Sequence, residues 1–358
     1  MTSIDGGAII YCEGGFNTPS GKTAHGLVRF TRRYDVIAVV DSKHVGSDAG
    51  EVIDGQPNGI PVVGGIKQAL GVAERAGKNA THLAVGLTPD WTELPTPIRA
   101  DLTKAVELGL NIDSGLRYFL TDDPGFREMA EANGVEIRDV RKPPPRNECH
   151  FFSGKIKEVT SAKVAVLGTD SAVGKRTTAW KLVKALHEMG YTAELVGTGQ
   201  TAWFQGARYG IILDSLDSDM VTGEIEHAFH AAWSYSSPDV IVIEGQGSLL
   251  NPATPRGFEI IAAVRPDAIV LQHAPGRRDY SGLPGYRIPP LRQQIEAVEM
   301  ISGQRNVVAV TVNHENFARD EIDTACRAIQ MVTGLPVEDP LVHDMESVLD
   351  ALRPVIQR

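Results

Sequence analysis

Cysteine is scarce in this 358-residue sequence, and long apolar runs are missing. The three cysteines, Cys12, Cys149 and Cys326, are widely spaced without a CxxC pair, which excludes a disulfide framework and a cysteine zinc site. No stretch approaches the ~18 uninterrupted apolar residues of a membrane-spanning helix, and the first residues lack the basic region of a signal peptide. We therefore expect a cytoplasmic protein without a membrane partner.

Basic residues are outnumbered, with 35 Lys and Arg against 45 Asp and Glu, for a net charge of -10. Because no basic run forms a stripe suited to a phosphodiester backbone, we expect no nucleic-acid partner. The 42% of hydrophobic residues is typical of a folded globular protein. Glycine is abundant: 36 of the 358 residues, or about 10%, compared with an average of about 7%, which favours tight turns where backbone approaches a ligand. This composition is compatible with nucleotide chemistry.

The length corresponds to about two average domains. The strongest break in the sequence is RKPPPRN at residues 141–147, because three consecutive prolines hold the backbone extended and donate no ladder hydrogen bonds. We place the boundary there, which gives one domain over residues 1–146 and a second over residues 147–358.

Short apolar runs alternate with helix-like stretches in both halves. Before the prolines we expect strands at 8–11, 36–40, 82–85 and 135–137, and helices at 66–75, 97–108 and 123–132. After them we expect strands at 163–167, 240–243, 268–271 and 307–310, and helices at 175–189, 222–234, 291–301 and 321–332. This alternation predicts an α/β fold with a parallel, doubly wound sheet in each domain. The Gly/Pro-rich loop over 274–290 is either a lid or a plain connector.

The most informative segment is residues 164–182, where a buried strand enters a glycine-containing loop that ends in Gly-Lys and continues as an amphipathic helix. This is the context of a P-loop, in which backbone N–H groups and the helix dipole converge on phosphate oxygens. The residues expected to bind the phosphates are Gly168, Thr169, Asp170, Ser171, Ala172, Val173, Gly174, Lys175, Arg176 and Thr177.

The loop departs from the standard pattern at Arg176, where Ser or Thr would normally hold Mg²⁺. Thr177 follows, but it lies about 100° further round the helix. We therefore expect no metal requirement and a loop that binds a diphosphate, such as that of coenzyme A, as a handle. A second loop, EGGFNTPSGKT at 13–23, is either a weaker ligand loop or an ordinary turn, because Pro19 removes one backbone donor.

In an open parallel sheet, ligands bind beyond the carboxyl ends of the strands. Glu244 follows one apolar run and His273 another, so both are candidate catalytic groups, although each also fits a structural role. Asp219, with Asp217 nearby, is either a third candidate or the N-cap of the next helix. Backbone donors near Gln200 and Gln246 are candidates for an oxyanion site.

A larger set of motifs carries a resemblance to known proteins. GTDSAVGK resembles the loop of dethiobiotin synthetase, in which Thr follows the lysine. Together GTDSAVGKRTT, GTGQT, EGQGSL, DSKHVGSDAGEVIDG, SGLRYFL and IRDVRKPPP resemble the D-glutamate N-acetyltransferase-like family over about residues 8–340. The resemblance implies a Rossmann-like amino-terminal domain followed by a P-loop NTPase-like carboxy-terminal domain. It further implies acetyl transfer from acetyl-CoA to the amine of D-glutamate, a step of D-amino-acid catabolism.

Under this interpretation Glu244 is the first choice for the base that deprotonates the amine, with His273 and Asp219 behind it. The acceptor, an amino acid with two carboxylates, needs cationic partners, and we expect it between the domains and expect a homo-oligomer. The candidate substrate-binding residues are Lys22, Arg141, Gln200, Gln246, Arg277, Arg278 and Arg287. Two alternatives stay open: an ATP- and Mg²⁺-dependent ligase similar to dethiobiotin synthetase, with Asp170 and Thr177 near the metal, and a non-catalytic nucleotide-sensing protein.

Overall fold

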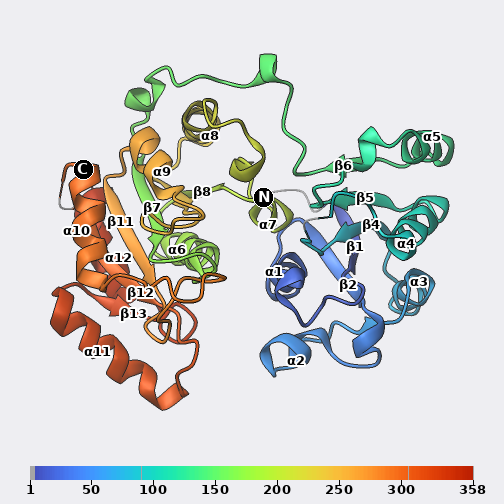
Figure 1. Cartoon of the computed structure of the whole chain (residues 1–358), viewed down its shortest axis with the longest axis horizontal. Helices are drawn as coiled ribbons and strands as arrows, with labels where there is room; N and C mark the ends of the chain where they lie inside the picture. Colours follow the sequence, from blue (N-terminus) through green and yellow to red (C-terminus); the bar gives the residue numbers. More distant parts are fainter. Residues whose placement is uncertain (1–4, 90, 305, 358) are drawn as a thin grey trace. The chain divides into compact units, whose positions relative to one another are not determined.

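A computed structural model describes residues 5–89, 91–304 and 306–357, which form two compact α/β units. The first unit comprises the chain up to Pro144 together with Gln200–Ala207. The second comprises Pro145–Gly199 and the chain from Arg208 onward, so the chain first passes from one unit to the other within the three prolines. In each unit the strands form their own sheet with helices packed around it (Figure 1).

The sheet of the first unit has the strand order β3-β2-β1-β4-β5-β6, and its strands pair in parallel. This is the order of a Rossmann fold, which confirms the first predicted architecture. Its strands are β1 (Gly6–Tyr11), β2 (Tyr34–Val40), β3 (Val62–Val63), β4 (Ala80–Val85), β5 (Asn111–Ser114) and β6 (Ile137–Asp139). Its helices are α1 (Lys22–Arg29), α2 (Ala49–Asp54), α3 (Ile66–Arg75), α4 (Thr96–Glu107), α5 (Pro124–Asn133) and the short α7 (Gln200–Phe204).

The sheet of the second unit has the order β13-β12-β11-β7-β10-β8-β9, again with parallel pairing. Its strands are β7 (Ala162–Gly168), β8 (Ala193–Gly197), β9 (Tyr209–Gly210), β10 (Val240–Glu244), β11 (Ala268–His273), β12 (Val307–Val312) and β13 (Val337–Glu338). Its helices are α6 (Lys175–Glu188), α8 (Val221–Ser236), α9 (Gly257–Val264), α10 (Leu291–Ser302), α11 (Ile322–Thr333) and α12 (Glu346–Ile356). Because β7 lies inside the sheet, the P-loop that follows it emerges between neighbouring strand ends.

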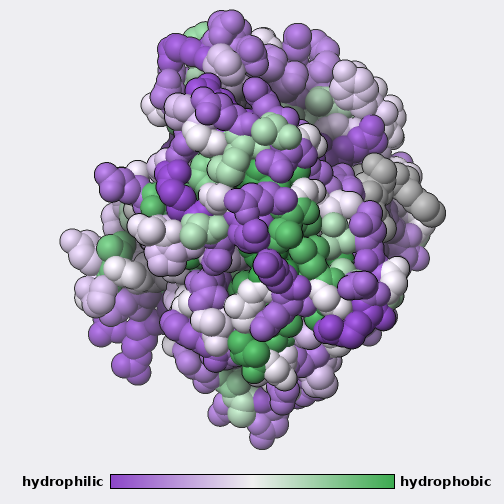
Figure 2. All heavy atoms as spheres, turned by 90° about the vertical axis from the view of Figure 1, so that its right-hand side faces the viewer, coloured by the Kyte–Doolittle hydropathy of each residue, from purple (hydrophilic) through white to green (hydrophobic). Residues whose placement is uncertain are grey.

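The strands expected from apolar runs are present, within a few residues at their ends. The expected strand at 135–137 is displaced to Ile137–Asp139, and the helix at 66–75 has the predicted bounds. Every residue of β10 is buried, because helices pack on the sheet from both sides. On the face shown in Figure 2, hydrophilic residues predominate and hydrophobic residues gather in small groups. Among the described residues, no helix combines the length and hydropathy needed to cross a membrane.

Candidate functional site

The P-loop joins the end of β7 at Gly168 to the start of α6 at Lys175. Gly174, the N-cap of α6, has a φ of 104°, and Ala172 has a φ of 54°, so the loop turns sharply into the helix. No side chain caps this helix start. Because the first N–H groups of a helix have no carbonyl partner within the helix, they face the loop as anion-binding donors.

Lys175 is buried, and its stem passes two glycines. A Cβ atom at Gly168 would lie 2.8 Å from Lys175 Cδ, and one at Gly245 would lie 3.1 Å from it. These two glycines therefore make room for the lysine. Its Nζ donates to the Asp170 carbonyl oxygen at 2.6 Å, and burial lowers the pKa of Lys175 to about 8. A bound phosphate group would favour the charged ammonium form.

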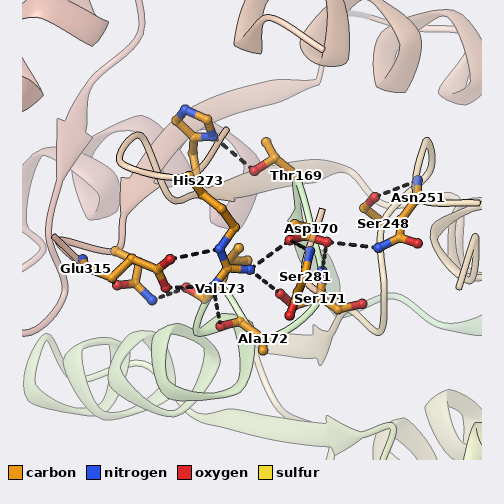
Figure 3. A network of polar contacts seen from close by, with 12 residues as sticks. Thr169, Asp170, Ser171, Ala172, Val173, Ser248, Asn251, His273, Ser281 and Glu315 are labelled. Carbon is orange, nitrogen blue, oxygen red and sulfur yellow. Dashed lines mark hydrogen bonds and ion pairs between the residues drawn. The ribbon is translucent and has the colours of Figure 1, made fainter. Parts of the chain in front are cut away.

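The Asp170 side chain ties the P-loop to its surroundings (Figure 3). Its Oδ1 accepts from Ser171 N at 2.6 Å and from Asn251 Nδ2 at 2.8 Å. Its Oδ2 accepts from Arg277 Nη1 at 2.7 Å and from Ser281 N at 2.8 Å. A carboxylate has about four acceptor positions, so these four donors occupy Asp170. This arrangement disfavours the metal-ligand role that the ligase alternative gave it.

Arg277 is held between two carboxylates of the chain itself. Besides Asp170, it pairs with Glu315, whose two oxygens accept from Nε at 2.9 Å and from Nη2 at 2.6 Å. Its Nη1 also donates to the Ser171 carbonyl at 2.7 Å. Residue type favours a substrate-binding role for Arg277, but its guanidinium is already paired within the chain, and these bonds fasten the 274–290 loop to the P-loop.

Glu244 stands at the carboxyl end of β10 and is only 5% exposed. Its Oε1 accepts from Thr198 N at 2.9 Å and from Thr198 Oγ1 at 3.4 Å. Burial raises the pKa of Glu244, and this effect is opposed first by the charge of Arg176 and then by the Thr198 hydrogen bonds and Lys175. Arg176 thus brings a fixed positive charge to the strand-end carboxylate, at the sequence position where a metal-binding Ser or Thr is usual.

His273, at the end of β11, forms a hydrogen bond of 2.9 Å between its Nδ1 and Thr169 Oγ1. Burial lowers the pKa of His273 to about 4, so the ring is neutral near pH 7. The neighbouring Gln272 accepts from Thr178 Oγ1 at 2.5 Å and from Thr311 Oγ1 at 2.6 Å. His273 therefore joins the P-loop network as an uncharged side chain.

Asp219 is placed differently from Glu244 and His273. Its carboxylate is half-exposed and pairs with Arg146 Nη2 at 2.6 Å, while Asp217 pairs with Nη1 of the same arginine at 3.0 Å. Met220 is the N-cap of α8, and no side chain caps that helix, so the capping alternative is wrong. The contacts of Asp219 are those of a surface ion pair, and we leave it out of the site.

The remaining candidates lie in several places. Gln246, beyond β10, has a buried side-chain oxygen without a hydrogen-bond partner among the described residues. Arg278 is exposed, and Arg287 is exposed with Asp279 3.5 Å away. Lys22, Arg141 and Gln200 belong to the first unit, and their roles in binding stay predictions.

The second glycine-rich loop, at 13–23 in the first unit, forms turns closed by its own backbone. Gly15 N donates to Cys12 O, Thr18 N to Gly15 O and Gly21 N to Thr18 O, at 2.9–3.2 Å. Gly14 N donates to the buried carboxylate of Asp41 at 2.6 Å. These bonds favour the ordinary-turn interpretation over a phosphate cradle.

Sequence reasoning missed several residues of the site. Asn313 directly follows β12, with Glu315 two residues further on, and Asn313 Nδ2 donates to the P-loop carbonyl of Val173 at 3.0 Å. The strand-end rule that found Glu244 would have found them as well. Asn251 lies in an irregular loop far along the chain from Asp170, so it left no such signal. Thr198 directly follows β8 in the GTGQT motif, where backbone donors were expected, and its N–H donates to Glu244 Oε1.

Comparison with known proteins agrees with this architecture. A family model described as the DUF1611 C-terminal P-loop domain matches residues 150–349, and one described as the DUF1611 N-terminal Rossmann-like domain matches residues 42–143. The chain belongs to the DUF1611 family. A crystal structure of a DUF1611 family protein from Anabaena variabilis is similar over 99% of this chain and 100% of its own, with a TM-score of 0.88 and 27% identity.

Two curated relatives of this DUF1611 protein have a named activity. A protein from Tritonibacter scottomollicae named D-glutamate N-acetyltransferase is 29% identical over 296 residues, covering 80% of each chain. A Pseudoalteromonas protein of the same name is 27% identical over 302 residues, covering 82% of this chain and 87% of its own. The resemblance drawn from the sequence motifs is thereby confirmed.

Proposed function

We propose that this DUF1611 protein is an N-acetyltransferase that moves the acetyl group of acetyl-CoA to the amine of D-glutamate. The main support is a combination of two features of the P-loop: the N-cap of its helix has no side-chain cap, and Arg176 acts on the buried Glu244. The free helix start keeps N–H donors for a diphosphate, whereas Arg176 stands where metal-dependent phosphoryl transfer usually needs a hydroxyl. The names of the two curated relatives support the same activity.

In the proposed reaction, the P-loop binds the diphosphate of acetyl-CoA. The donors are the N–H groups at the start of α6 and the Lys175 ammonium group, whose stem is enclosed by glycines. We propose that the reaction needs no metal, because direct acyl transfer to an amine involves no phosphoryl group to activate. The P-loop therefore acts as an anchor for the donor.

We propose Glu244 as the base. The ammonium form of the acceptor gives one proton to the Glu244 carboxylate, and the neutral amine then attacks the thioester carbonyl. The C–N bond forms, the C–S bond breaks, and the departing thiolate takes the second proton that the nitrogen gives up on becoming an amide, while Glu244 returns the first proton to solvent before the next turnover. Because burial raises the pKa of Glu244, its carboxylate is a better proton acceptor than an exposed one. The unpartnered Gln246 oxygen suits a remaining N–H of the same amine.

The proposal is tested by identifying the product. The protein is incubated with acetyl-CoA labelled with ¹³C in the acetyl group and with D-glutamate, and N-acetylglutamate is sought by mass spectrometry. The expected result is labelled N-acetyl-D-glutamate formed in step with free coenzyme A. A parallel reaction contains ATP and Mg²⁺ without acetyl-CoA, and production of ADP there with no labelled product in the first reaction would overturn the proposal.

A further inference from the structure

The chain that follows the three prolines runs across helix α8 within the second unit. We call residues 146–158 the strap. Gly223, in the first turn of α8, allows a close approach, because a Cβ atom there would lie 2.0 Å from the carbonyl oxygen of His150. The strap ends in a turn of 3₁₀ helix, Lys155–Glu158, which packs on α8. The strap and the helix therefore form a continuous interface inside one unit.

Two carboxylates of α8 hold the backbone of the strap. Glu226 is buried, and its side chain accepts from Ser153 N at 2.6 Å and from Ile156 N at 3.0 Å. The Ser153 hydroxyl adds a third bond to Glu226, at 2.8 Å. Glu224 accepts from His150 N at 2.5 Å. Because these N–H groups meet water only when the strap leaves α8, hydrogen exchange at these amides reports whether the strap is docked.

A pair of stacked histidines joins the strap to α8 at the same place. The ring centroids of His150 and His227 are 3.6 Å apart, and the two ring planes differ by only 9°. His150 Nδ1 lies 2.9 Å from Glu224 Oε1, and because a carboxylate only accepts, this nitrogen is the donor. Uncharged rings attract each other by dispersion at this spacing, whereas two imidazolium ions repel each other.

The surroundings of the pair decide which form of the rings the docked strap favours. The charged groups around the pair are Glu224 and His230 of α8 and Lys155 and Glu158 of the strap. Partial burial lowers the pKa of His227, the neighbouring His150 lowers it further, and Glu224 opposes both effects. The docked strap therefore disfavours a proton on His227.

We propose that the stacked histidines form a pH-sensitive latch between the strap and α8. Near neutral pH the rings stack and the strap is docked. When the strap leaves α8, the pKa of His227 returns to its ordinary value of 6.5, so the released form takes up a proton that the docked form resists. Docking therefore weakens as pH falls below about 6.5. The proposal does not rest on the proposed function, because no substrate takes part in it.

The test is hydrogen exchange of the full-length protein, followed by NMR at pH 7.5 and pH 5.5. Protection factors, which compare each amide with its intrinsic exchange rate at the same pH, are measured for His150, Ser153 and Ile156. In His227→Phe a ring remains to stack on His150, but it cannot be charged. His230→Gln is the matched control, because His230 lies on the same helix and contacts the strap through an ion pair instead of a stacked ring.

We expect the three protection factors to fall by up to about tenfold between pH 7.5 and pH 5.5, the change that one proton produces over one pH unit. The fall should persist in His230→Gln and disappear in His227→Phe, while amides of the buried strand β10 keep their protection. Protection that does not fall in the wild-type protein, a fall that persists in His227→Phe, or one that disappears in His230→Gln would overturn the latch. A loss shared by β10 would indicate general unfolding and would overturn it as well.

Discussion

Binding of acetyl-CoA should make the protein take up a proton in alkaline solution. Burial lowers the pKa of Lys175 to about 8, whereas its ordinary value is 10.5. At pH 9 about 0.9 of the lysine is therefore neutral before binding, and at pH 7 only about 0.1. A diphosphate beside Nζ stabilises the ammonium form and returns its pKa toward or above the ordinary value. The complex then holds up to about 0.9 more protons per chain at pH 9.

Calorimetric titration with acetyl-CoA measures this uptake when it is repeated in buffers of different ionisation enthalpy. Acetyl-CoA suits the assay because its sulfur is acylated and does not titrate. Lys175→Arg is the matched control, because a guanidinium stays charged at pH 9 and has no proton to gain. An uptake that does not increase between pH 7 and pH 9, or that survives in Lys175→Arg, would refute the reasoning about this lysine.

Three further outcomes are expected. Glu244→Gln should lower the turnover of acetyl transfer by roughly 10²–10⁴-fold with little change in KM, and near-normal turnover would remove its role as base. Gly245→Ala should weaken acetyl-CoA binding in calorimetry, because its Cβ would lie 2.7 Å from Val166 O; Gly65→Ala, in open space, should not. As pH falls from 6.5 to 4, His273 is protonated in the unfolded state and stays neutral in the folded state. The free energy of unfolding measured with urea should therefore fall by up to about 3 kcal/mol, and this contribution should be missing in His273→Gln.

Much of the fold is predictable from sequence because its long strands are continuous apolar runs. β7, β10, β11 and β12 are buried on both faces, so their hydrophobicity is plain without knowledge of their neighbours. The two-residue strands β3, β9 and β13 are too short to leave a pattern. The segment at 200–207 is apolar for a reason that local periodicity cannot reveal, since Phe204 packs in the core of the other unit.

The candidate site is predictable where position in the sheet decides it. Glu244 and His273 stand at the ends of strands in a parallel sheet, and the glycines and lysine of the P-loop identify it from sequence. Contacts between residues that are distant in the chain cannot be predicted in this way. Arg277 and Asp170 are 107 residues apart, and nothing local indicates that the arginine binds this carboxylate instead of a substrate. Asp219 follows no strand directly, so only its residue type supports a catalytic role, and its surface ion pair with Arg146 does not.

The most direct test of the account is the release of free thiol from acetyl-CoA, followed with a chromogenic thiol reagent. The reactions contain D-glutamate, L-glutamate or no amine, each with and without EDTA. We expect release that requires D-glutamate and is unchanged by EDTA. Release that EDTA abolishes, or no release with either glutamate, would contradict it.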